Sequence, residues 1–268
     1  RLSNSIGETP MIKISKKLYA KAELLNPTGS IKDRPASYII NDAEKRNLLS
    51  FGDTIIEATS GNMGISFAWL AAERGYNCKI VMPSNMSEER KQMLRLFGAE
   101  LIEVGAGDFE EAIRLRDDLA KSNGWFNCNQ FANPLNIKAH RETTAVEIIR
   151  DVVGDMKLLI SALVSGTGTG GTLMGAGLMI KESLPDMKII AVEPLESPVM
   201  SGGKPGIHGI QGIGDGSKFL VNMGDVDEVI TISTDEAKER AVKMAREMGI
   251  FIGISAGANI LASERWIE

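Results

Sequence analysis

The sequence has few of the side chains that metal sites and hydrolytic triads need. Its 268 residues include two cysteines, Cys78 and Cys128, and two histidines, His140 and His208. Neither histidine has a cluster of ligand residues around it, so the sequence predicts no metal site and no Ser-His-Asp hydrolase. Both cysteines lie in apolar, strand-like runs. We therefore expect two buried structural thiols in a reducing cytoplasm.

A basic surface and a long apolar run are also missing. The chain has 30 Lys and Arg against 35 Asp and Glu, a net charge of −5. The excess acid is spread along the chain, and a basic stripe that could bind a phosphate backbone is absent, so nucleic acid is not an expected partner. No apolar run approaches the roughly 20 residues of a membrane span, and residues 1–9 lack the apolar core of a signal peptide. These features predict a cytoplasmic protein without a membrane partner.

What recurs along the chain is a short apolar strand followed by a helix. Residues 78–83 predict a strand, Ser87 an N-cap for a helix to about Phe97, and Gly98 a C-terminal glycine for that helix. The alternation returns at residues 54–57, 100–104, 125–128, 157–164, 187–192 and 228–233, the last followed by a helix to Met248. Such alternation predicts an α/β fold with mostly parallel sheets.

One lysine follows a turn rich in Pro and Gly. Lys32 lies in the segment NPTGSIKDR, residues 26–34, at the start of a predicted helix. There it would be partly withdrawn from water, which lowers the pKa of an amine and allows a neutral amine to form a Schiff base. An ordinary surface lysine beside a turn would show the same spacing. This segment alone therefore does not distinguish a Schiff-base lysine from a surface lysine.

Three further turns join a predicted strand to a predicted helix, where α/β sites usually lie. Residues 57–64, EATSGNMG, predict an anion cradle suited to a carboxylate, or a plain capping turn. Residues 165–172, SGTGTGGT, predict a phosphate site because glycines allow close backbone approach at a helix N-terminus. A dinucleotide site is disfavoured, since the dinucleotide motif belongs to the first strand-to-helix turn of its fold and this turn is late in the chain. Residues 253–258 alone indicate little.

Together these segments resemble the cysteine synthase and cystathionine β-synthase family, pyridoxal 5′-phosphate (PLP) enzymes of fold type II, like tryptophan synthase. The matching motifs are residues 26–34, 59–64, 130–134, 168–172, 193–199 and 201–214. The resemblance implies PLP as cofactor, a small amino-acid substrate, a homodimer and two three-layer α/β domains. Residues 35–136 would form a smaller, mobile, substrate-side domain. Residues 1–34 and 137–268 would form a larger domain that binds the PLP phosphate.

The resemblance also implies a role for each motif. Lys32 would bind PLP as a Schiff base and move the substrate Cα proton. The phosphate would be held by Gly168, Thr169, Gly170, Gly171 and Thr172. The cofactor ring would contact Asn62 at O3′ and Ser255 at the pyridine nitrogen. The neutral serine would favour loss of a β-substituent, which gives an α-aminoacrylate, over transamination. The substrate-binding residues would be Thr59, Ser60, Gly61, Asn62, Met63 and Gln130.

Two positions depart from the family pattern. Met63 stands where the family has threonine, which puts an apolar side chain into the substrate pocket. Asp215 stands where cysteine synthases usually have alanine and cystathionine β-synthases tyrosine, beside the substrate β-carbon. A carboxylate there would repel bisulfide and could accept a proton from water. We therefore predict Asp215 to be catalytic in a reaction of L-cysteine with water that gives L-serine and hydrogen sulfide.

Other functions stay open. If Asp215 points to solvent, the protein would be an O-acetylserine sulfhydrylase, making L-cysteine from O-acetyl-L-serine and sulfide. A serine/threonine dehydratase would share the fold, but residues 130–134 and 201–214 match the β-replacement enzymes better. A non-catalytic regulatory protein with this fold is disfavoured, because Lys32, Asn62 and Ser255 are all retained.

Overall fold

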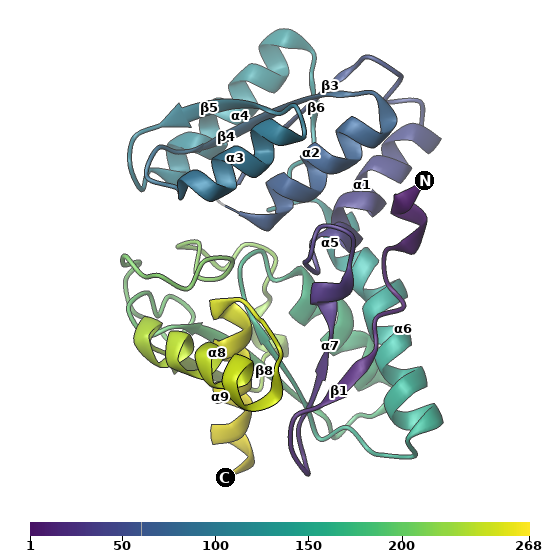
Figure 1. Ribbon diagram of the computed structural model, residues 1–268, viewed down its shortest axis with the longest axis vertical. Helices are drawn as coiled ribbons and strands as arrows, with labels where there is room; N and C mark the ends of the chain where they lie inside the picture. The colour runs from purple at the N-terminus through teal and green to yellow at the C-terminus, as the bar shows by residue number, and fades with distance from the viewer. Residues whose placement is uncertain (60) are drawn as a thin grey trace. The chain divides into compact units, whose positions relative to one another are not determined.

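The computed structural model describes residues 1–59 and 61–268 and confirms the α/β fold with mostly parallel sheets (Figure 1). The described chain divides into two compact units. Unit 1 comprises residues 1–6 and 25–136, and unit 2 comprises residues 7–24 and 137–268. None of the helices among the described residues is long and apolar enough to span a membrane.

Unit 1 is built on a four-stranded parallel sheet in the order β5-β4-β3-β6. Successive residues of β3 alternate between two cores, Ile55 in one and Ile56 in the other, as the period of a strand requires. Helices pack on both faces, so this unit has three layers. The strands are β3 (Thr54–Ala58), β4 (Asn77–Pro83), β5 (Glu100–Val104) and β6 (Phe126–Asn127), and the helices are α1 (Asp33–Lys45), α2 (Asn62–Arg74), α3 (Glu88–Leu96), α4 (Phe109–Asn123) and α5 (Pro134–Ala139).

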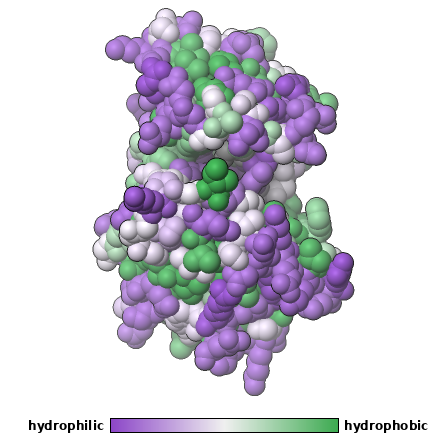
Figure 2. All heavy atoms as spheres, turned by 90° about the vertical axis from the view of Figure 1, so that its left-hand side faces the viewer, coloured by the Kyte–Doolittle hydropathy of each residue, from purple (hydrophilic) through white to green (hydrophobic). Residues whose placement is uncertain are grey.

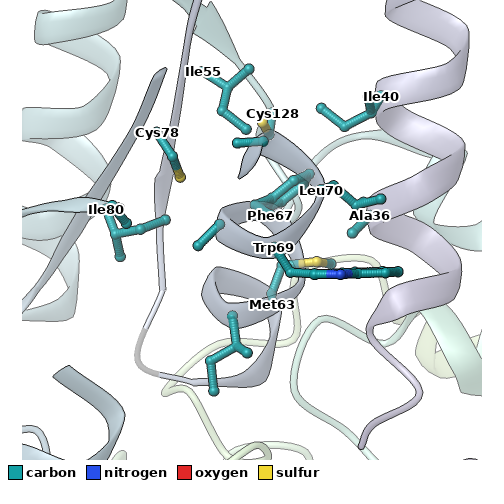
Figure 3. Close-up of a cluster of buried hydrophobic side chains, with 14 of the residues drawn as sticks. Ala36, Ile40, Ile55, Met63, Phe67, Trp69, Leu70, Cys78, Ile80 and Cys128 are labelled. Carbon is teal, nitrogen blue, oxygen red and sulfur yellow. The ribbon is translucent and has the colours of Figure 1, made fainter. Parts of the chain in front are cut away.

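The larger core of unit 1 lies between the sheet and helices α1 and α2 (Figure 3). It contains both cysteines, which are free and buried as predicted. Burial raises the pKa of the Cys78 thiol to about 12, and it also raises the pKa of Cys128. Both thiols therefore stay protonated at neutral pH and act as small apolar side chains.

Unit 2 contains a three-stranded parallel sheet in the order β7-β8-β9. Helix α7 packs in one core and helices α8 and α9 in another, again giving three layers. A short antiparallel hairpin and two π-helical turns complete the unit. The strands are β1 (Met11–Lys13), β2 (Tyr19–Lys21), β7 (Ala162–Gly166), β8 (Lys188–Pro194) and β9 (Glu228–Ile232); the helices are α6 (Ala145–Ile148), α7 (Gly171–Ser183), α8 (Thr234–Met248) and α9 (Ile254–Ile267); the π-helical turns are His140–Thr144 and Ile149–Asp155.

The described residues also include short 3₁₀ helices at Leu2–Ser5, Glu23–Leu25 and Met223–Asp225. On the face of the protein that Figure 2 shows, polar side chains cover most of both units and apolar side chains form small separate patches. Such scattered apolar atoms are normal for a protein surface.

One predicted strand begins later than expected. The sequence predicted residues 157–164, but β7 begins at Ala162. Lys157 has a left-handed backbone (φ 58°), and Leu158 N donates to Val152 O, so the chain is still turning out of the preceding π-helical turn. Leu159, which the apolar pattern assigned to a buried strand, is 81% exposed.

The boundary between the units also differs from the prediction. Residues 1–6 and 25–34 belong to unit 1, whereas the sequence grouped residues 1–34 with residues 137–268. The buried Asp33 explains the difference for the lysine segment. Its carboxylate accepts hydrogen bonds from Thr28 N at 2.8 Å and from Ser66 Oγ at 2.6 Å, which ties residues 26–34 to helix α2.

Candidate functional site

The predicted site residues are divided between the two units. Those in unit 1 are Lys32, Thr59, Gly61, Asn62, Met63 and Gln130, and those in unit 2 are Gly168, Thr169, Gly170, Gly171, Thr172, Asp215 and Ser255. Ser60 lies outside the described residues. Among the described residues, no group of three or more His, Cys, Asp or Glu side chains is arranged to hold a metal ion.

Lys32 is the N-cap residue of helix α1 and is half-buried. The turn before it is closed by a hydrogen bond from Gly29 N to Asn26 O at 2.8 Å, with Gly29 in the left-handed region (φ 85°). Lys32 N donates to Ser30 Oγ at 3.2 Å. With Asp33 tied to helix α2, the backbone of the lysine is held on both sides, so its side chain starts from a fixed point.

Thr59 and Gly61 lie between β3 and α2, in the segment that we call the substrate loop after its predicted role. Thr59 N donates to Val81 O at 3.0 Å, and Thr59 Oγ1 accepts from Gly61 N at 3.1 Å. Gly61 is the N-cap of α2, and among the described residues no side-chain hydrogen bond caps this end of the helix. The positive end of the helix dipole and the first-turn amides therefore face the loop, as an anion site requires.

Gln130 is attached to the strand that precedes the substrate loop. Its backbone N donates to Glu57 Oε2 at 2.9 Å, and its side-chain Nε2 donates to Ala58 O at 3.1 Å. Glu57 is fully buried, and its other oxygen, Oε1, accepts from Arg116 Nη1 at 2.7 Å. Burial raises the pKa of Glu57, while the Arg116 cation acts to lower it.

Neither Glu57 nor Arg116 is among the site residues predicted from the sequence. A signal was present in the sequence, because a glutamate within the apolar strand TIIEA must find a buried partner. Nothing in the spacing of residues pointed to Arg116 as that partner, since it lies on a helix 59 residues further along the chain.

Met63 differs from its predicted position. Its side chain is 1% exposed and packs in the core between the sheet and helices α1 and α2 (Figure 3). The expectation of an apolar side chain in the substrate pocket is therefore wrong. The second residue of α2 faces the core because the helix buries that stripe against the sheet.

Residues 167–170 form the loop between β7 and α7, which we call the phosphate loop. Gly170 is the N-cap of α7 with φ 88°, and a Cβ atom added to it would lie 2.5 Å from Val221 Cγ2. A Cβ atom on Gly168 would lie 2.7 Å from Gly212 O. Only glycine fits either position, because the loop backbone packs closely against residues 212 and 221 where it enters the N-terminus of a 13-residue helix.

A buried histidine, which the sequence analysis left without a role, supports the first turn of α7. His140 is fully buried; its Nδ1 lies 3.0 Å from Thr144 Oγ1 and its Nε2 lies 3.4 Å from Thr172 Oγ1. The ring therefore orients a hydroxyl that follows the phosphate loop. The sequence offered no ligand cluster around His140, because its partners come from a π-helical turn and from a helix remote in the chain.

Asp215 lies against the phosphate loop. A Cβ atom on Gly168 would lie 3.2 Å from Asp215 Oδ2, so the carboxylate is directed toward that loop. The segment before it is fixed by His208. Ile210 N donates to His208 Nδ1 at 3.2 Å, so Nε2 carries the ring proton and donates to Gly214 O at 2.9 Å.

Ser255 is the second residue of helix α9 and is half-buried. A Cβ atom on Gly212 would lie 3.9 Å from its Oγ, so this hydroxyl lies on the same side of unit 2 as the Gly212 backbone. Helix α9 packs very closely on α8, since a Cβ atom on Gly257 would lie 2.2 Å from Ala237 O.

Comparison with known proteins identifies the family. Residues 2–267 match the model of the family described as pyridoxal-phosphate dependent enzyme. A cysteine synthase of Staphylococcus aureus is 40% identical over 273 residues, covering 98% of this chain and 86% of its own length. A hydrogen sulfide-producing enzyme of Fusobacterium nucleatum superimposes with a TM-score of 0.93 at 38% identity, covering 99% of this chain and 82% of its own. An aspartate-to-asparagine form of that enzyme, in complex with an α-aminoacrylate intermediate, gives a TM-score of 0.94 at 38% identity, with 99% and 83% coverage.

The residues of this chain fit the family's cofactor. The phosphate loop is rich in glycine and ends at the N-terminus of α7, where Gly170 is the N-cap and makes no side-chain cap, so backbone N–H groups and the helix dipole suit a phosphate. Ser255 offers a neutral hydroxyl for a ring nitrogen, and Lys32 offers a primary amine on a fixed backbone. With the family model spanning nearly the whole chain, the chain belongs to the pyridoxal-phosphate-dependent enzymes of the cysteine synthase family.

Proposed function

We propose that the protein catalyses β-replacement on L-cysteine with water, giving L-serine and hydrogen sulfide. The Cβ–S bond breaks and a Cβ–O bond forms. Water supplies its hydroxyl group to Cβ and one proton to the released sulfide, so no oxidant or reductant is needed. The observation that carries the proposal is the carboxylate of Asp215, directed toward the phosphate loop at Gly168.

Bound PLP supplies a sink for the negative charge that develops at Cα. Lys32 carries the cofactor through Nζ, then takes the Cα proton and returns it to the same carbon at the end of the reaction. In unit 2, Gly168, Thr169, Gly170, Gly171 and Thr172 bind the phosphate, and the Ser255 hydroxyl meets the ring nitrogen. In unit 1, Asn62 binds the ring O3′.

The substrate carboxylate is bound by Thr59, Ser60, Gly61 and Gln130, together with the backbone at the start of α2, including that of Met63. Unit 1 thus has the substrate role and unit 2 the phosphate role. The helix dipole of α2 favours an anion here. Holding the carboxylate fixes the direction in which the Cβ–S bond leaves, since the amino acid is then attached at both its amine and its carboxylate.

Asp215 selects water over hydrosulfide. An anionic nucleophile is repelled by the carboxylate, whereas neutral water can donate a proton to it as the Cβ–O bond forms. Asp215 can pass that proton to a departing thiolate in the next turnover. The relatives described as hydrogen sulfide-producing enzymes support this direction of the chemistry.

The test is to incubate the PLP-loaded protein with L-cysteine alone and to quantify sulfide, serine and pyruvate. We expect serine in the same amount as sulfide. The Asp215→Asn variant should make serine about 10² to 10³ times more slowly, the usual cost of losing a general base. Serine formation at the parental rate in this variant would contradict the role of Asp215, and pyruvate in place of serine would indicate simple elimination.

A second candidate is the cysteine synthase reaction, in which O-acetyl-L-serine and sulfide give L-cysteine. The observation that favours it is the 40% identity to a curated cysteine synthase over nearly the whole chain. Little sulfide from L-cysteine, with rapid L-cysteine formation from O-acetyl-L-serine and sulfide, would establish this reaction and leave Asp215 without a catalytic role.

A further inference from the structure

A buried ion pair lies directly beneath the substrate loop. Glu57 is the fourth residue of β3, two positions before Thr59, and is fully buried. Arg116 lies in the middle of α4 and is 1% exposed. The Arg116 Nη1 to Glu57 Oε1 distance is 2.7 Å. Both charges of this pair are therefore removed from water.

The pair connects three segments of unit 1. The Glu57 carboxylate accepts hydrogen bonds from Ala58 N at 2.8 Å and from Gln130 N at 2.9 Å. Arg116 Nη2 donates to Asn129 Oδ1 at 3.2 Å. The ion pair thus links the end of β3 to residues 129–130, which are far away in the chain. Glu57 binds the amides of Ala58 and Gln130, and Arg116 binds the side chain of Asn129.

Stability alone does not explain this arrangement. Desolvating two charges is costly, and apolar residues of similar volume often replace a buried ion pair without loss of stability. What an apolar pair cannot do is to fix the backbone of Ala58 and Gln130 through directed hydrogen bonds. Asn129 adds a further constraint, because its backbone is in the left-handed region (φ 50°) and its side chain is oriented by Arg116.

We propose that Glu57 and Arg116 are positioning residues that hold Gln130 and the substrate loop in the geometry that binds the substrate carboxylate. The inference rests on the carboxylate-binding role proposed above for Gln130 and the loop. Neither Glu57 nor Arg116 touches the substrate in this role. Arg116 holds the Glu57 carboxylate in one orientation, and the carboxylate in turn holds the amides on which the site is built.

The experiment uses the PLP-loaded protein and L-alanine, an amino acid that has a carboxylate but no β-substituent to lose. Its dissociation constant, read from the cofactor absorbance, is measured for the wild type and for Arg116→Met and Arg116→Lys. The dissociation constant of PLP for each apoprotein is measured in parallel. We expect Arg116→Met to weaken L-alanine about tenfold, the equivalent of one misaligned hydrogen bond to a charged group, and to leave PLP affinity within about twofold.

Arg116→Lys keeps the charge and should recover part of the lost L-alanine affinity. The matched control is Arg114→Met, on the same helix, because Arg114 is exposed and pairs only with the helix residues Glu111 and Asp118 in the contacts described. It should change neither dissociation constant. With L-cysteine as substrate, Arg116→Met should raise KM by a similar factor and change kcat by less than about threefold.

If Arg116→Met does not fold, Asn129→Gly tests the same link. Glycine tolerates the left-handed backbone at this position and removes only the side chain that Arg116 orients. We expect L-alanine to bind about two- to fourfold more weakly, a fraction of one hydrogen bond. Unchanged L-alanine affinity in both variants, or equal weakening of L-alanine and PLP, would overturn the positioning role.

L-alanine binding involves no nucleophile, so the result is independent of whether water or sulfide attacks. A wild-type protein that binds PLP but not L-alanine would overturn the carboxylate site itself, and this inference with it. A wild-type protein that binds L-alanine but makes no serine would contradict only the proposed reaction.

Discussion

The substrate loop and the phosphate loop occupy equivalent places in their units, each between a parallel strand and the N-terminus of the next helix, yet they are held differently. In both loops a threonine hydroxyl accepts a backbone hydrogen bond, Thr59 Oγ1 from Gly61 N and Thr169 Oγ1 from Gly171 N. The difference lies in what supports them, because the neighbours of the substrate loop are fixed by the side chains of the buried Glu57–Arg116 pair. The phosphate loop depends on backbone packing, with Gly168 and Gly170 pressed against residues 212 and 221.

The difference matches the two ligands that we propose. A phosphate group is the same in every turnover, so a rigid cradle of glycine backbone at a helix N-terminus suffices. A substrate carboxylate arrives and leaves in each turnover, and side-chain hydroxyls and amides can adapt to it. We infer that the phosphate loop is intolerant of added atoms, whereas the substrate loop is sensitive to lost hydrogen bonds.

The largest effect is expected for Lys32→Ala. This variant removes the proposed covalent bond between Lys32 and the cofactor and leaves the proposed binding of the phosphate group by the phosphate loop unchanged. Turnover should fall by at least about 10³-fold, since the group that we propose to move the Cα proton is lost. The phosphate loop should still bind PLP without a covalent bond. Absorbance of the purified variant, with PLP released by denaturation and quantified, checks both statements; complete loss of bound PLP would show that the phosphate loop does not hold it alone.

A paired alanine substitution tests the contrast in tolerance directly. Gly170→Ala places a Cβ at φ 88°, 2.5 Å from Val221 Cγ2, and should weaken PLP binding at least about tenfold through backbone strain. Gly61 has a negative φ (−158°), and the described atom nearest to its added Cβ is Nη1, at the end of the Arg90 side chain, which can move. Gly61→Ala should therefore keep PLP affinity within about threefold.

Titration of apoprotein with PLP, for both variants and for Gly154→Ala, gives the comparison. Gly154 has no atom closer than 3.9 Å to an added Cβ and serves as a control in unit 2. Equal losses of PLP affinity at positions 61 and 170 would mean that the two loops do not differ in the way described.

The smallest effect concerns a carboxylate at the opposite end of the phosphate-loop sheet. Asp227 accepts from Lys181 Nζ at 2.7 Å and from Ile189 N at 2.8 Å, and these bonds lower its pKa from 3.8 to about 2. Its stabilisation is fully present above the unfolded value of 3.8 and is lost as the pH falls from there through 2. Because the group is largely solvated, Asp227→Asn should cost under about 1 kcal/mol at pH 7.

Thermal unfolding of the PLP-loaded wild type and Asp227→Asn should show a difference in Tm that is constant from pH 7 to pH 5 and shrinks toward pH 3.5. PLP affinity should not change. Weaker PLP binding by Asp227→Asn would indicate that the C-terminal end of α7 also affects the conformation of the phosphate loop. Glu228→Gln, an exposed neighbour, is the control for loss of a carboxyl group.

The sequence was most informative where local chemistry decides the structure. Residues 100–104 form β5 with the expected bounds, and Gly98 lies after α3 in the left-handed region as a C-terminal glycine should. Ser87 is the N-cap of α3, although its side chain makes no capping hydrogen bond. Glycine spacing also predicted the loop at the start of α7, because a close backbone approach leaves a compositional trace.

Features that depend on partners remote in the chain were not predictable. Met63 looked like a pocket residue from its motif, and only the packing of α2 on the sheet shows that it belongs to the core. Arg116 is one of two arginines on helix α4, and the buried glutamate opposite it is what distinguishes it from Arg114. The contact between His140 and Thr144 was not predictable either, because no residue pattern indicates the π-helical turn that contains both residues.

Gly257 has a consequence for how this enzyme can change over evolution. Its missing side chain lets α9 lie on Ala237 and Ala241 of α8, and Ser255 is only two residues away on the same helix turn. Any larger residue at position 257 would lift the start of α9 and carry the serine hydroxyl with it. Variation at position 257 is therefore a route by which a substitution outside the proposed cofactor and substrate sites could change the contact proposed between Ser255 and the ring nitrogen.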